Sequence, residues 1–433
     1  MQSYKATLDY LYNRLPMFQR IGPAAYKHSL ENSLRLDEIC HSPHKRYSTV
    51  HIAGTNGKGS VSHMLAAVFQ SAGYKTGLFT SPHLVDFRER IRINGRMAPK
   101  SFVARWVSGF LEKEPAFQPS FFELTAAMAF DYFADRQVDV AVIETGLGGR
   151  LDSTNIITPE ASVITNISWD HASLLGNSLR EIASEKAGII KKGIPVIISQ
   201  RQPEVEAVFL EKAKEMSAPI WFASDEFTSE NGTQDTRGKQ VFHFSHNGMM
   251  RYRQLETDLT GIYQRLNIPA VLQTVDNLVS RGWKIDEKAI YEGLANVIGL
   301  TGLQGRWQVL GNSPLVVCDT GHNEEGIREV VDQLRHTTYQ TLHFILGLVA
   351  DKDISHILPL LPREACYYFT RANIPRALDE TLLKQQAAGH HLAGESFHSV
   401  AGAFRAALEA ARPGDMVFIG GSNFVVGEVL AGI

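Results

Sequence analysis

The sequence predicts an α/β protein of two domains, the larger built on a mostly parallel sheet with helices on both faces. The 433 residues, of which 44% are hydrophobic and 21% are charged, suffice for two sizeable cores. Short runs rich in valine and isoleucine recur between longer amphipathic stretches, as in parallel sheets whose strands are buried on both faces. The same alternation restarts near residue 300, which indicates the second and smaller domain.

The first domain is expected to cover residues 1–299. Four apolar runs predict strands of its sheet, at about 48–53, 138–143, 161–167 and 194–198. Residues 60–72 follow the first run, carry apolar side chains at helical spacing and stop at Gly73. This pattern predicts a helix directly after the first strand.

The polar stretch 222–258 predicts a β-hairpin at the edge of this sheet, because Asn-Gly pairs at 231–232 and 247–248 separate short alternating segments. A helical region is expected at about 262–298. The second domain, of Rossmann-like α/β type, is expected to cover 300–433. Its predicted strands lie at about 315–318, 342–348, 366–369 and 416–419.

Charge and cysteine content narrow the class of protein. The formal net charge of −3 provides no basic field for gripping a nucleic-acid backbone. Cys40, Cys318 and Cys366 are far apart, odd in number and without metal-ligand spacing, which favours a reducing compartment. The chain start has no signal-peptide core, and no apolar run approaches membrane-spanning length. We therefore expect a cytoplasmic protein that binds neither nucleic acid nor a membrane.

The stretch 50–62, VHIAGTNGKGSVS, is typical of a phosphate-binding loop with one residue too many, since Gly59 separates Lys58 from Ser60. It stands between a predicted strand and a predicted helix, as a P-loop requires, and its glycines let backbone N–H groups face phosphate oxygens. We expect Lys58 to reach the β- and γ-phosphates and the Ser60 hydroxyl to ligate Mg²⁺. The competing interpretation is a glycine-rich surface turn with a chance lysine.

A candidate metal ligand closes the second predicted strand. Glu144 ends the segment VDVAVIE and opens the glycine-rich turn TGLGGR, at the strand end where α/β proteins bind ligands. Magnesium bound to a triphosphate takes one or two protein carboxylates. We therefore favour Glu144 as a metal ligand over a solvated carboxylate.

Two further residues are ambiguous on spacing alone. His171 follows the strand ASVITNI, where a structural or surface histidine is as consistent with the pattern as an imidazole metal ligand. Lys186 lies near the end of a predicted helix that begins around Leu179, and by spacing it is a solvated helix charge.

Seven motifs between residues 54 and 189 carry a family resemblance, which extends in order over nearly the whole chain. They are GTNGKGS (54–60), TSPHL (80–84), ERIRING (89–95), FFELTAAMAF (121–130), ETGLGGRLDSTN (144–155), DH (170–171) and SEKAGI (184–189). In these motifs the sequence resembles folylpolyglutamate synthase and dihydrofolate synthase, members of the Mur ligases, which form amide bonds with ATP. That family places one extra residue in the loop, as Gly59 does here. TSPHL and ETGLGGRLD are specific to its folate branch.

The resemblance implies roles for single residues. It makes Lys58, Lys186 and His171 catalytic, with Lys186 carbamylated. The implied metal ligands are Ser60 and Glu144 for one Mg²⁺, and His171 and carbamylated Lys186 for a second. The implied ATP contacts are Thr55, Asn56, Gly57, Lys58, Gly59, Ser60, Asn267, Arg306 and Asp319, with His322 beside them. The implied pterin contacts are Ala24, Ala25, Tyr26, Lys27, Ser81, Pro82, His83, Phe121, Phe122, Glu123, Leu151, Asp152 and Ser153.

Two local departures concern loop geometry only. Thr320-Gly321 stands where the family often has Gly-Ala, and Ile268-Pro269 follows Asn267 where small alanines are more usual. Neither departure removes a functional side chain.

The implied activity is that of an ADP-forming ligase. ATP phosphorylates a carboxylate of dihydropteroate or of a reduced folate, and the amine of L-glutamate attacks the acyl phosphate; we expect both acceptors to be used. The first domain would bind ATP and folate, and the second would complete the ATP and glutamate cleft. ATP, two Mg²⁺ ions and a monovalent cation are the implied cofactors, and a monomer the implied state. A cell-wall amino-acid ligase and a nucleotide-gated switch ATPase stay open as alternatives.

Overall fold

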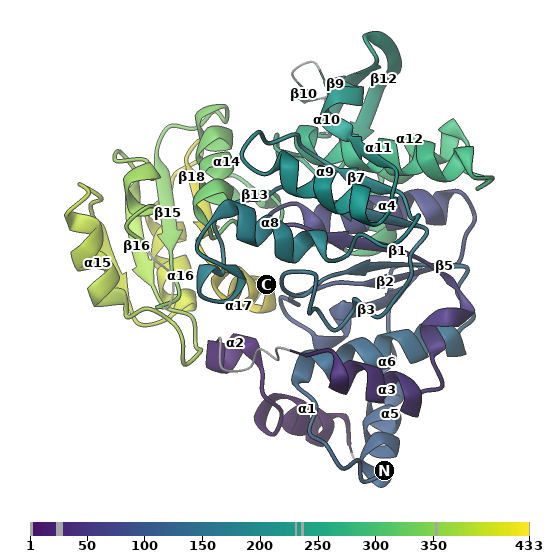
Figure 1. Ribbon diagram of the computed structural model, residues 1–433. Helices are drawn as coiled ribbons and strands as arrows, with labels where there is room; N and C mark the ends of the chain where they lie inside the picture. Colours follow the sequence, from purple (N-terminus) through teal and green to yellow (C-terminus); the bar gives the residue numbers. More distant parts are fainter. Residues whose placement is uncertain (1–2, 23–28, 230–231, 235–237, 351–353, 433) are drawn as a thin grey trace. The chain divides into compact units, whose positions relative to one another are not determined.

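The structure, a computed structural model, describes residues 3–22, 29–229, 232–234, 238–350 and 354–432 (Figure 1). The chain forms two compact units. Unit 1 contains Met1–His83, Arg88–Asp258 and Gln264–Leu303, and unit 2 contains Leu84–Phe87, Leu259–Tyr263 and Gln304–Ile433. Two short segments from the first three-quarters of the chain therefore belong to the C-terminal unit. The division of function between the units stays a prediction.

Unit 1 is built on an eight-stranded sheet in the order β4-β3-β2-β5-β1-β6-β7-β8. Its strands are β1 Ser48–Ala53, β2 Thr76–Phe79, β3 Ile91–Ile93, β4 Arg96–Met97, β5 Val140–Glu144, β6 Ala161–Ile164, β7 Val196–Ile198 and β8 Ile220–Phe222. Six of these strands pair in parallel, and only β3 and β4 pair antiparallel. Every residue of β5, β6 and β7 is buried, as a sheet covered on both faces requires. The predicted mostly parallel sheet is confirmed.

Helices cover both faces of this sheet, with α3, α5 and α6 below the strands in Figure 1 and α4 and α11 above them. The helices of unit 1 are α1 Tyr4–Asn13, α2 Phe18–Ile21, α3 Glu31–Ile39, α4 Lys58–Ser71, α5 Lys100–Glu112, α6 Phe121–Asp135, α7 Ala172–Leu175, α8 Leu179–Ala187, α9 Glu206–Glu215, α10 Ala223–Glu226, α11 Gln264–Ser280, α12 Glu287–Ala295 and α13 Val297–Thr301. Among the described residues, two 3₁₀ turns are η2 Pro43–Arg46 in unit 1 and η3 Phe87–Arg90, whose first residue belongs to unit 2.

Helix α4 is the central helix of unit 1. All its residues from Ser60 to Phe69 are buried, because it packs against β2 and β5 of the sheet and also against α11, α12 and α13. A Cβ added at Gly293 of α12 would lie 2.7 Å from the Val68 Cα, so glycine permits the close approach of these two helices. The helix that follows the phosphate loop is therefore held rigidly.

The polar excursion forms its own sheet. Strands β9 Phe227–Ser229, β10 Thr233–Gln234, β11 Gln240–His246 and β12 Met249–Thr257 pair only with one another and are antiparallel. The predicted hairpin turn at Asn247-Gly248 is confirmed, with φ of 50° and 76°. Its predicted place at the edge of the large sheet is wrong, because α10 follows β8 and β12 packs against α12 instead. Asn231 lies outside the described residues.

Unit 2 contains a second, six-stranded sheet in the order β13-β14-β18-β15-β16-β17, parallel except for β13. Its strands are β13 Gln308–Asn312, β14 Leu315–Cys318, β15 Leu342–Leu346, β16 Cys366–Thr370, β17 Gly394–Phe397 and β18 Met416–Gly420. Its helices are α14 Glu324–Arg335, α15 Glu380–Ala388, α16 Val400–Ala410 and α17 Asn423–Gly432, with a 3₁₀ turn η4 Leu358–Leu360. Val317 belongs to one core cluster, and Val316 and Cys318 belong to another. This alternation buries both faces and confirms the predicted second α/β domain.

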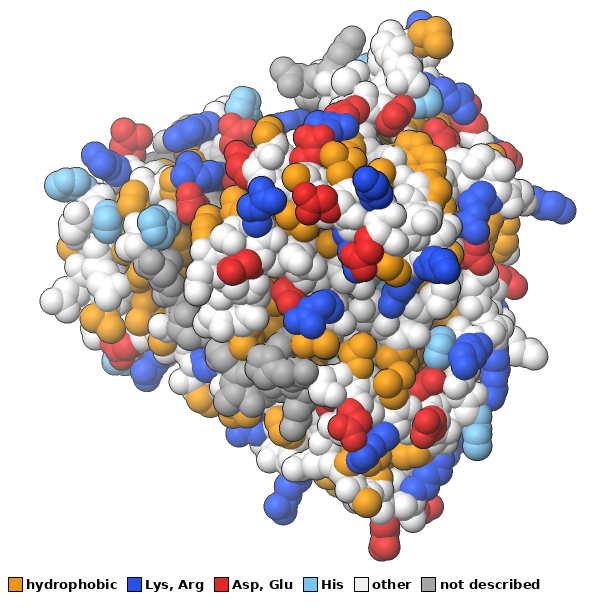
Figure 2. Space-filling view, viewed as in Figure 1, with side chains coloured by type: hydrophobic (Ala, Val, Ile, Leu, Met, Phe, Trp, Pro, Cys, Tyr) orange, Lys and Arg blue, Asp and Glu red, His pale blue; other side chains and the backbone are white. Residues whose placement is uncertain are grey.

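The surface carries charges of both signs, and the cysteines form no disulfide. Acidic and basic side chains are interspersed on the face shown in Figure 2. All three cysteines are free thiols. Among the residues that the structure describes, no helix is both long and apolar enough to cross a membrane.

Candidate active site

The glycine-rich loop connects β1 to α4 at the carboxyl edge of the parallel strands. Gly54 has a φ of 145° and Gly57 a φ of 88°, both in the region that favours glycine. A Cβ would lie 1.8 Å from the Thr165 Oγ1 at Gly54 and 2.3 Å from the Asn267 Oδ1 at Gly57. Only glycine fits at these two positions, so the loop cannot be an arbitrary surface turn.

The end of strand β6 fixes the shape of the loop. The backbone N–H of Thr55 donates to the Asn166 carbonyl at 2.8 Å, and that of Asn56 donates to the Asn166 Oδ1 at 2.8 Å. Thr165 Oγ1 donates to the Asn56 carbonyl at 2.5 Å. Asn166 was not among the predicted site residues, although a polar TN pair directly after a buried strand is a usable signal. The loop is therefore preorganised by a neighbouring strand.

The amino end of α4 is built to receive an anion. Its N-cap, Gly57, has no side chain that caps the helix, and its first turn contains no acidic residue. The first N–H groups and the helix dipole therefore point toward the loop. Lys58 Nζ donates to the carbonyls of Gly54 at 3.0 Å and Thr55 at 3.1 Å, so its charge already lies over the loop.

Ser60 is the third residue of α4, and its side chain is held by α11. Gln264 Nε2 donates to the Ser60 Oγ at 3.3 Å, and Asn267 Nδ2 donates to the Gln264 Oε1 at 2.9 Å. The three side chains are buried. Gln264 was missed by sequence reasoning, because nothing in its spacing distinguishes it from other helical amides. The hydrogen bond from Gln264 occupies one lone pair of the Ser60 hydroxyl oxygen and leaves the other available to a metal ion.

Glu144 stands at the end of β5, as predicted, and its side chain is buried. Its Oε2 accepts a hydrogen bond from the Ser81 N–H at 3.0 Å, across 63 residues of sequence. The carboxylate is therefore not a solvated strand-end charge. It joins the TSPHL segment to the carboxyl edge of the sheet.

Lys186, in the last turn of α8, is buried against the phosphate loop. Its Nζ donates to the Gly54 carbonyl at 2.8 Å, so the interpretation as a solvated helix charge is wrong. Burial, reinforced by the charge of Lys58, lowers the pKa of Lys186 to about 7. The carboxylate of Asp170 opposes this shift, and its Oδ1 accepts from the His171 N–H at 3.0 Å.

His171 precedes the short helix α7 with a φ of 52°. Its Nε2 lies 3.8 Å from the Asp170 Oδ1, and its ring meets the Phe18 ring edge-on at 5.3 Å between centroids. The imidazole is about one-third exposed and is the most accessible of the predicted metal ligands. Asp170, which belongs to the DH motif but was assigned no role from the sequence, acts on both His171 and Lys186.

Two predicted pterin contacts, Asp152 and Glu123, stabilise the backbone near them. Asp152 accepts four hydrogen bonds, from the N–H groups of Gly146, Leu147 and Thr154 and from the Thr154 hydroxyl, at 2.5 to 3.0 Å. Glu123 forms a capping box with Ser120 at the start of α6. Both carboxylates shape the segments that carry the other predicted contacts.

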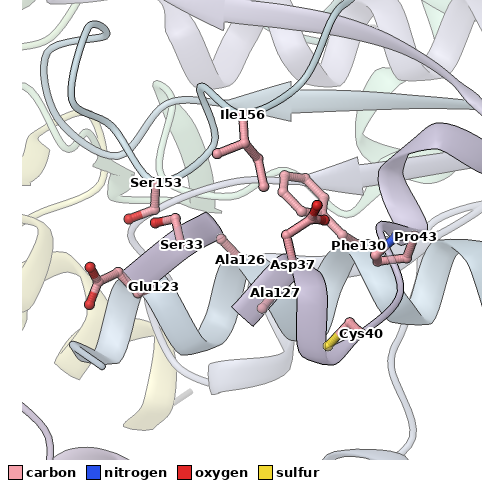
Figure 3. Close-up of a pocket in the computed structure, with 10 residues that line it drawn as sticks. All are labelled: Ser33, Asp37, Cys40, Pro43, Glu123, Ala126, Ala127, Phe130, Ser153 and Ile156. Atoms are coloured by element: carbon pink, nitrogen blue, oxygen red, sulfur yellow. The ribbon is translucent and has the colours of Figure 1, made fainter. Parts of the chain in front are cut away.

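A pocket lies between α3 and α6 (Figure 3). Its lining includes Glu123 and Ser153 from the predicted pterin contacts together with Ser33, Asp37 and Phe130. Its volume of about 10 Å³ holds no more than a single water molecule. The pocket is therefore too small for a pterin ring.

Two predicted pterin segments remain. Phe122 lies against the glycine-rich turn, since a Cβ at Gly146 would be 2.4 Å from its ring. Residues 24–27 lie outside the described residues.

In unit 2, Asp319 follows β14 and is buried. Its carboxylate accepts from the Tyr263 hydroxyl at 2.6 Å, the Trp307 N–H at 2.7 Å and the Gly321 N–H at 2.7 Å. Arg306, the next predicted ATP contact, donates to the Gly305 carbonyl at 3.2 Å. The His322 Nδ1–H donates to the Thr320 carbonyl at 2.8 Å. Asp319 thus organises the turn that presents Arg306 and His322. Tyr263 was missed by sequence reasoning.

Comparison with known proteins identifies the family. The Mur ligase middle domain matches residues 52–275, and the Mur ligase glutamate ligase domain matches residues 305–423. The folylpolyglutamate synthase of Lacticaseibacillus casei is 34% identical over 350 residues, which cover 78% of this chain and 80% of that protein. The structure of Escherichia coli FolC in complex with DHPP and ADP matches with a TM-score of 0.86 at 28% identity, over 99% of this chain and 97% of that chain.

The chain belongs to the folylpolyglutamate synthase and dihydrofolate synthase family of Mur ligases. A probable bifunctional folylpolyglutamate synthase/dihydropteroate synthase of Haloferax volcanii is 33% identical over 424 residues. The match covers 93% of this chain but 48% of that relative, so the chain spans about half of its length.

The donor chemistry around the loop fits the Mg²⁺ that this family implies. The described residues contain no group of three or more His, Cys, Asp or Glu side chains that could hold a metal ion. Glu144 and Ser60 offer one carboxylate and one hydroxyl, and Mg²⁺ takes one or two carboxylates with phosphate oxygens and waters. An ammonium group has no free lone pair, so protonated Lys186 cannot be a ligand, whereas the carbamate that the resemblance implies would offer carboxylate oxygens.

Behind Asp152 lies a histidine that makes folding sensitive to acid. His51 is fully buried in β1, and its Nε2 lies 2.8 Å from the Thr154 Oγ1, which in turn donates to Asp152. Burial lowers its pKa from 6.5 to about 3. Below about pH 6.5 the imidazole of His51 is protonated in the unfolded chain but stays neutral in the folded chain. The free energy of unfolding therefore decreases as the pH falls toward 3.

Because of the lowered pKa of His51, we expect the free energy of unfolding to decrease by about 3 kcal/mol when the pH is lowered from 7 to 4. His51→Gln keeps a donor for Thr154 and should lose that much less on acidification, as measured by urea unfolding at both pH values. Exposed His41→Gln is the control and should behave as the wild type. Equal acid sensitivity in all three proteins would contradict the prediction.

Proposed function

We propose that the chain adds L-glutamate to the carboxylate of a pterin-bearing acceptor, with ATP as the energy source and ADP and phosphate as products. The observation that carries this proposal is the preformed phosphate loop. Its sequence has the extra residue typical of the family, and Lys58 and Lys186 both donate to the carbonyl of Gly54. The Escherichia coli neighbour, whose structure is a complex with DHPP and ADP, supports the nucleotide and the acceptor class.

The chemistry needs an activated carboxylate, because a free carboxylate is a poor electrophile for an amine. Transfer of the γ-phosphoryl group to the acceptor gives an acyl phosphate and ADP, and the amine of glutamate then displaces phosphate to form the amide. The α4 N–H groups and Lys58 bind the phosphate oxygens and stabilise the charge that develops in transfer. When bound, Mg²⁺ would neutralise phosphate charge, held by Ser60 and Glu144, with a second ion at His171 and carbamylated Lys186.

Both acceptors, dihydropteroate and reduced folates, are proposed substrates. The test is ADP release with MgATP and L-glutamate, offering dihydropteroate and tetrahydrofolate separately. Turnover with only one acceptor would refute the dual activity. A cell-wall ligase would release ADP only with a nucleotide-linked sugar peptide, and a switch ATPase would hydrolyse ATP without consuming glutamate. Either result would refute the proposed function.

The remaining assignments are proposals on the family resemblance. Unit 1 would bind ATP and the acceptor, and unit 2 would contribute Arg306 and Asp319 to ATP and His322 beside it. A monovalent cation, a monomeric state and a cytoplasmic location stay predictions. Sedimentation of the purified chain tests the monomer.

The carbamate on Lys186 has a testable pH dependence, because only the neutral amine reacts with CO₂. With a pKa of about 7, roughly nine-tenths of Lys186 is neutral at pH 8 and only about a tenth at pH 6. At fixed CO₂ pressure we expect a ¹³C-carbamate signal in NMR that grows over this range. Lys186→Gln should lack it, and the control Lys192→Gln, at an exposed lysine, should keep it. A signal that persists in Lys186→Gln would refute the assignment.

A further inference from the structure

An arginine with one unsatisfied N–H group is buried beside the TSPHL segment. Arg90, the last residue of η3, is 1% exposed. Its Nη2 is buried and has no hydrogen-bond partner among the described residues. The charges of Glu144 and Glu89 favour the cation through space. A buried N–H group without an acceptor still costs free energy, so the Nη2 group is costly to the fold unless a ligand accepts its hydrogen bond.

The neighbours of Arg90 leave its charge intact. Its Nε donates to the His83 Nδ1 at 2.7 Å, so the proton of His83 must lie on Nε2, 3.3 Å from the Tyr12 hydroxyl oxygen. His83 is thereby a neutral acceptor and does not compensate the charge. The ring of Phe121 lies 5.1 Å from the guanidinium carbon and supports a cation only weakly. Burial lowers the pKa of Arg90 to about 10, which leaves it protonated at neutral pH.

These contacts place Arg90 between segments that lead to the acceptor and to the phosphate chemistry. Phe121 opens α6, and His83 lies two residues after Ser81, whose N–H is bound by Glu144. The guanidinium thus contacts two of the predicted acceptor segments, and the charge of the predicted metal ligand Glu144 acts on it. A planar fork with a free N–H group is suited to a carboxylate.

We infer that Arg90 binds the carboxylate of the pterin-bearing acceptor, the group that is phosphorylated. The inference rests on the proposed function for the identity of the acceptor. The linkage through Ser81 to Glu144 favours the reacting carboxylate over one farther along the substrate. The carboxylates of L-glutamate share the same chemistry and are the competing source.

A binding cycle tests this without requiring turnover. Dihydropteroate and its carboxamide, which lacks the negative charge, are titrated into wild type and Arg90→Gln. The wild type should prefer the carboxylate by about 10- to 100-fold, and Arg90→Gln should bind the two ligands within about threefold of each other. Equal weakening of both ligands, as expected from a disturbed fold, would overturn the inference.

The control is Arg92→Gln, because Arg92 is buried nearby but donates to the backbone carbonyls of Glu89 and Gly95 at 3.3 and 3.2 Å. This variant should keep the carboxylate preference. If Arg90→Gln keeps that preference and instead raises the KM of L-glutamate, the arginine binds glutamate and the inference fails. Failure of the proposed function would look different, since the wild type would then release no ADP in the presence of glutamate and either acceptor.

Discussion

Replacing Lys58 with alanine is expected to lower kcat/KM for MgATP by at least about 1,000-fold with either acceptor. Lys58 is the first residue of α4, and its ammonium group already lies over the carbonyls of Gly54 and Thr55. Phosphate oxygens bound at this helix end would lose their principal positive partner. Steady-state ADP release, with ATP varied at saturating acceptor and glutamate, measures the effect.

Lys100→Ala is the matched control, since Lys100 also begins a helix, α5, but is exposed and follows no glycine loop. It should retain wild-type turnover. The unfolding free energy of Lys58→Ala should stay within about 1 to 2 kcal/mol of wild type, because the hydrogen bonds that Lys58 donates to Gly54 and Thr55 contribute about 1 kcal/mol each. Near-normal activity in Lys58→Ala would refute the phosphate role of this lysine.

Glu144→Gln is expected to lower kcat/KM by about 100- to 1,000-fold and to raise the Mg²⁺ concentration needed for half-maximal activity. Glutamine keeps the shape of the side chain and an oxygen that can accept from the Ser81 N–H, so the TSPHL segment should stay in place. The change therefore isolates the negative charge. Titration of activity with Mg²⁺ at fixed ATP is the measurement.

Glu160→Gln provides the comparison, because Glu160 precedes β6 at the opposite, amino edge of the same sheet and pairs with Arg281. It should show the wild-type Mg²⁺ dependence. If Glu144→Gln were active at the same Mg²⁺ concentration as wild type, Glu144 would be a structural acceptor for Ser81 and nothing more.

Local patterns predicted the architecture because they are encoded over short distances. A buried strand, glycines and a helix start are adjacent in the chain, so the segment from β1 to α4 could be placed from its own residues. The turn at Asn247-Gly248 was predictable for the same reason. The separate sheet that contains this turn was not, because whether a hairpin joins a sheet depends on the helices packed beside it.

The environment of single site residues was not predictable from the residues themselves. Lys186 meets Gly54 across 132 residues of sequence, and only the packing of α8 decides whether its ammonium group is solvated or buried. The family resemblance implied a role for Lys186 but did not indicate its burial. Asn166, Gln264 and Arg90 escaped notice because amides and arginines are common at surfaces, and their partners lie on other elements.

The carbonyl of Gly54 accepts from both Lys58 and Lys186, and this shared acceptor couples proton binding to anion binding. The charge of Lys58 helps to lower the pKa of Lys186, so a phosphate that neutralises Lys58 must raise it again. Thermodynamic reciprocity then requires that protonation of Lys186 strengthen phosphate binding. In the absence of metal and CO₂, nucleotide affinity should increase as the pH falls through 7. The observed binding heat should differ between buffers of different ionisation enthalpy, because a proton is taken up on binding. Equal observed heats in all buffers would show that the two lysines are not coupled. The loop would thus take up a proton with each phosphate it receives.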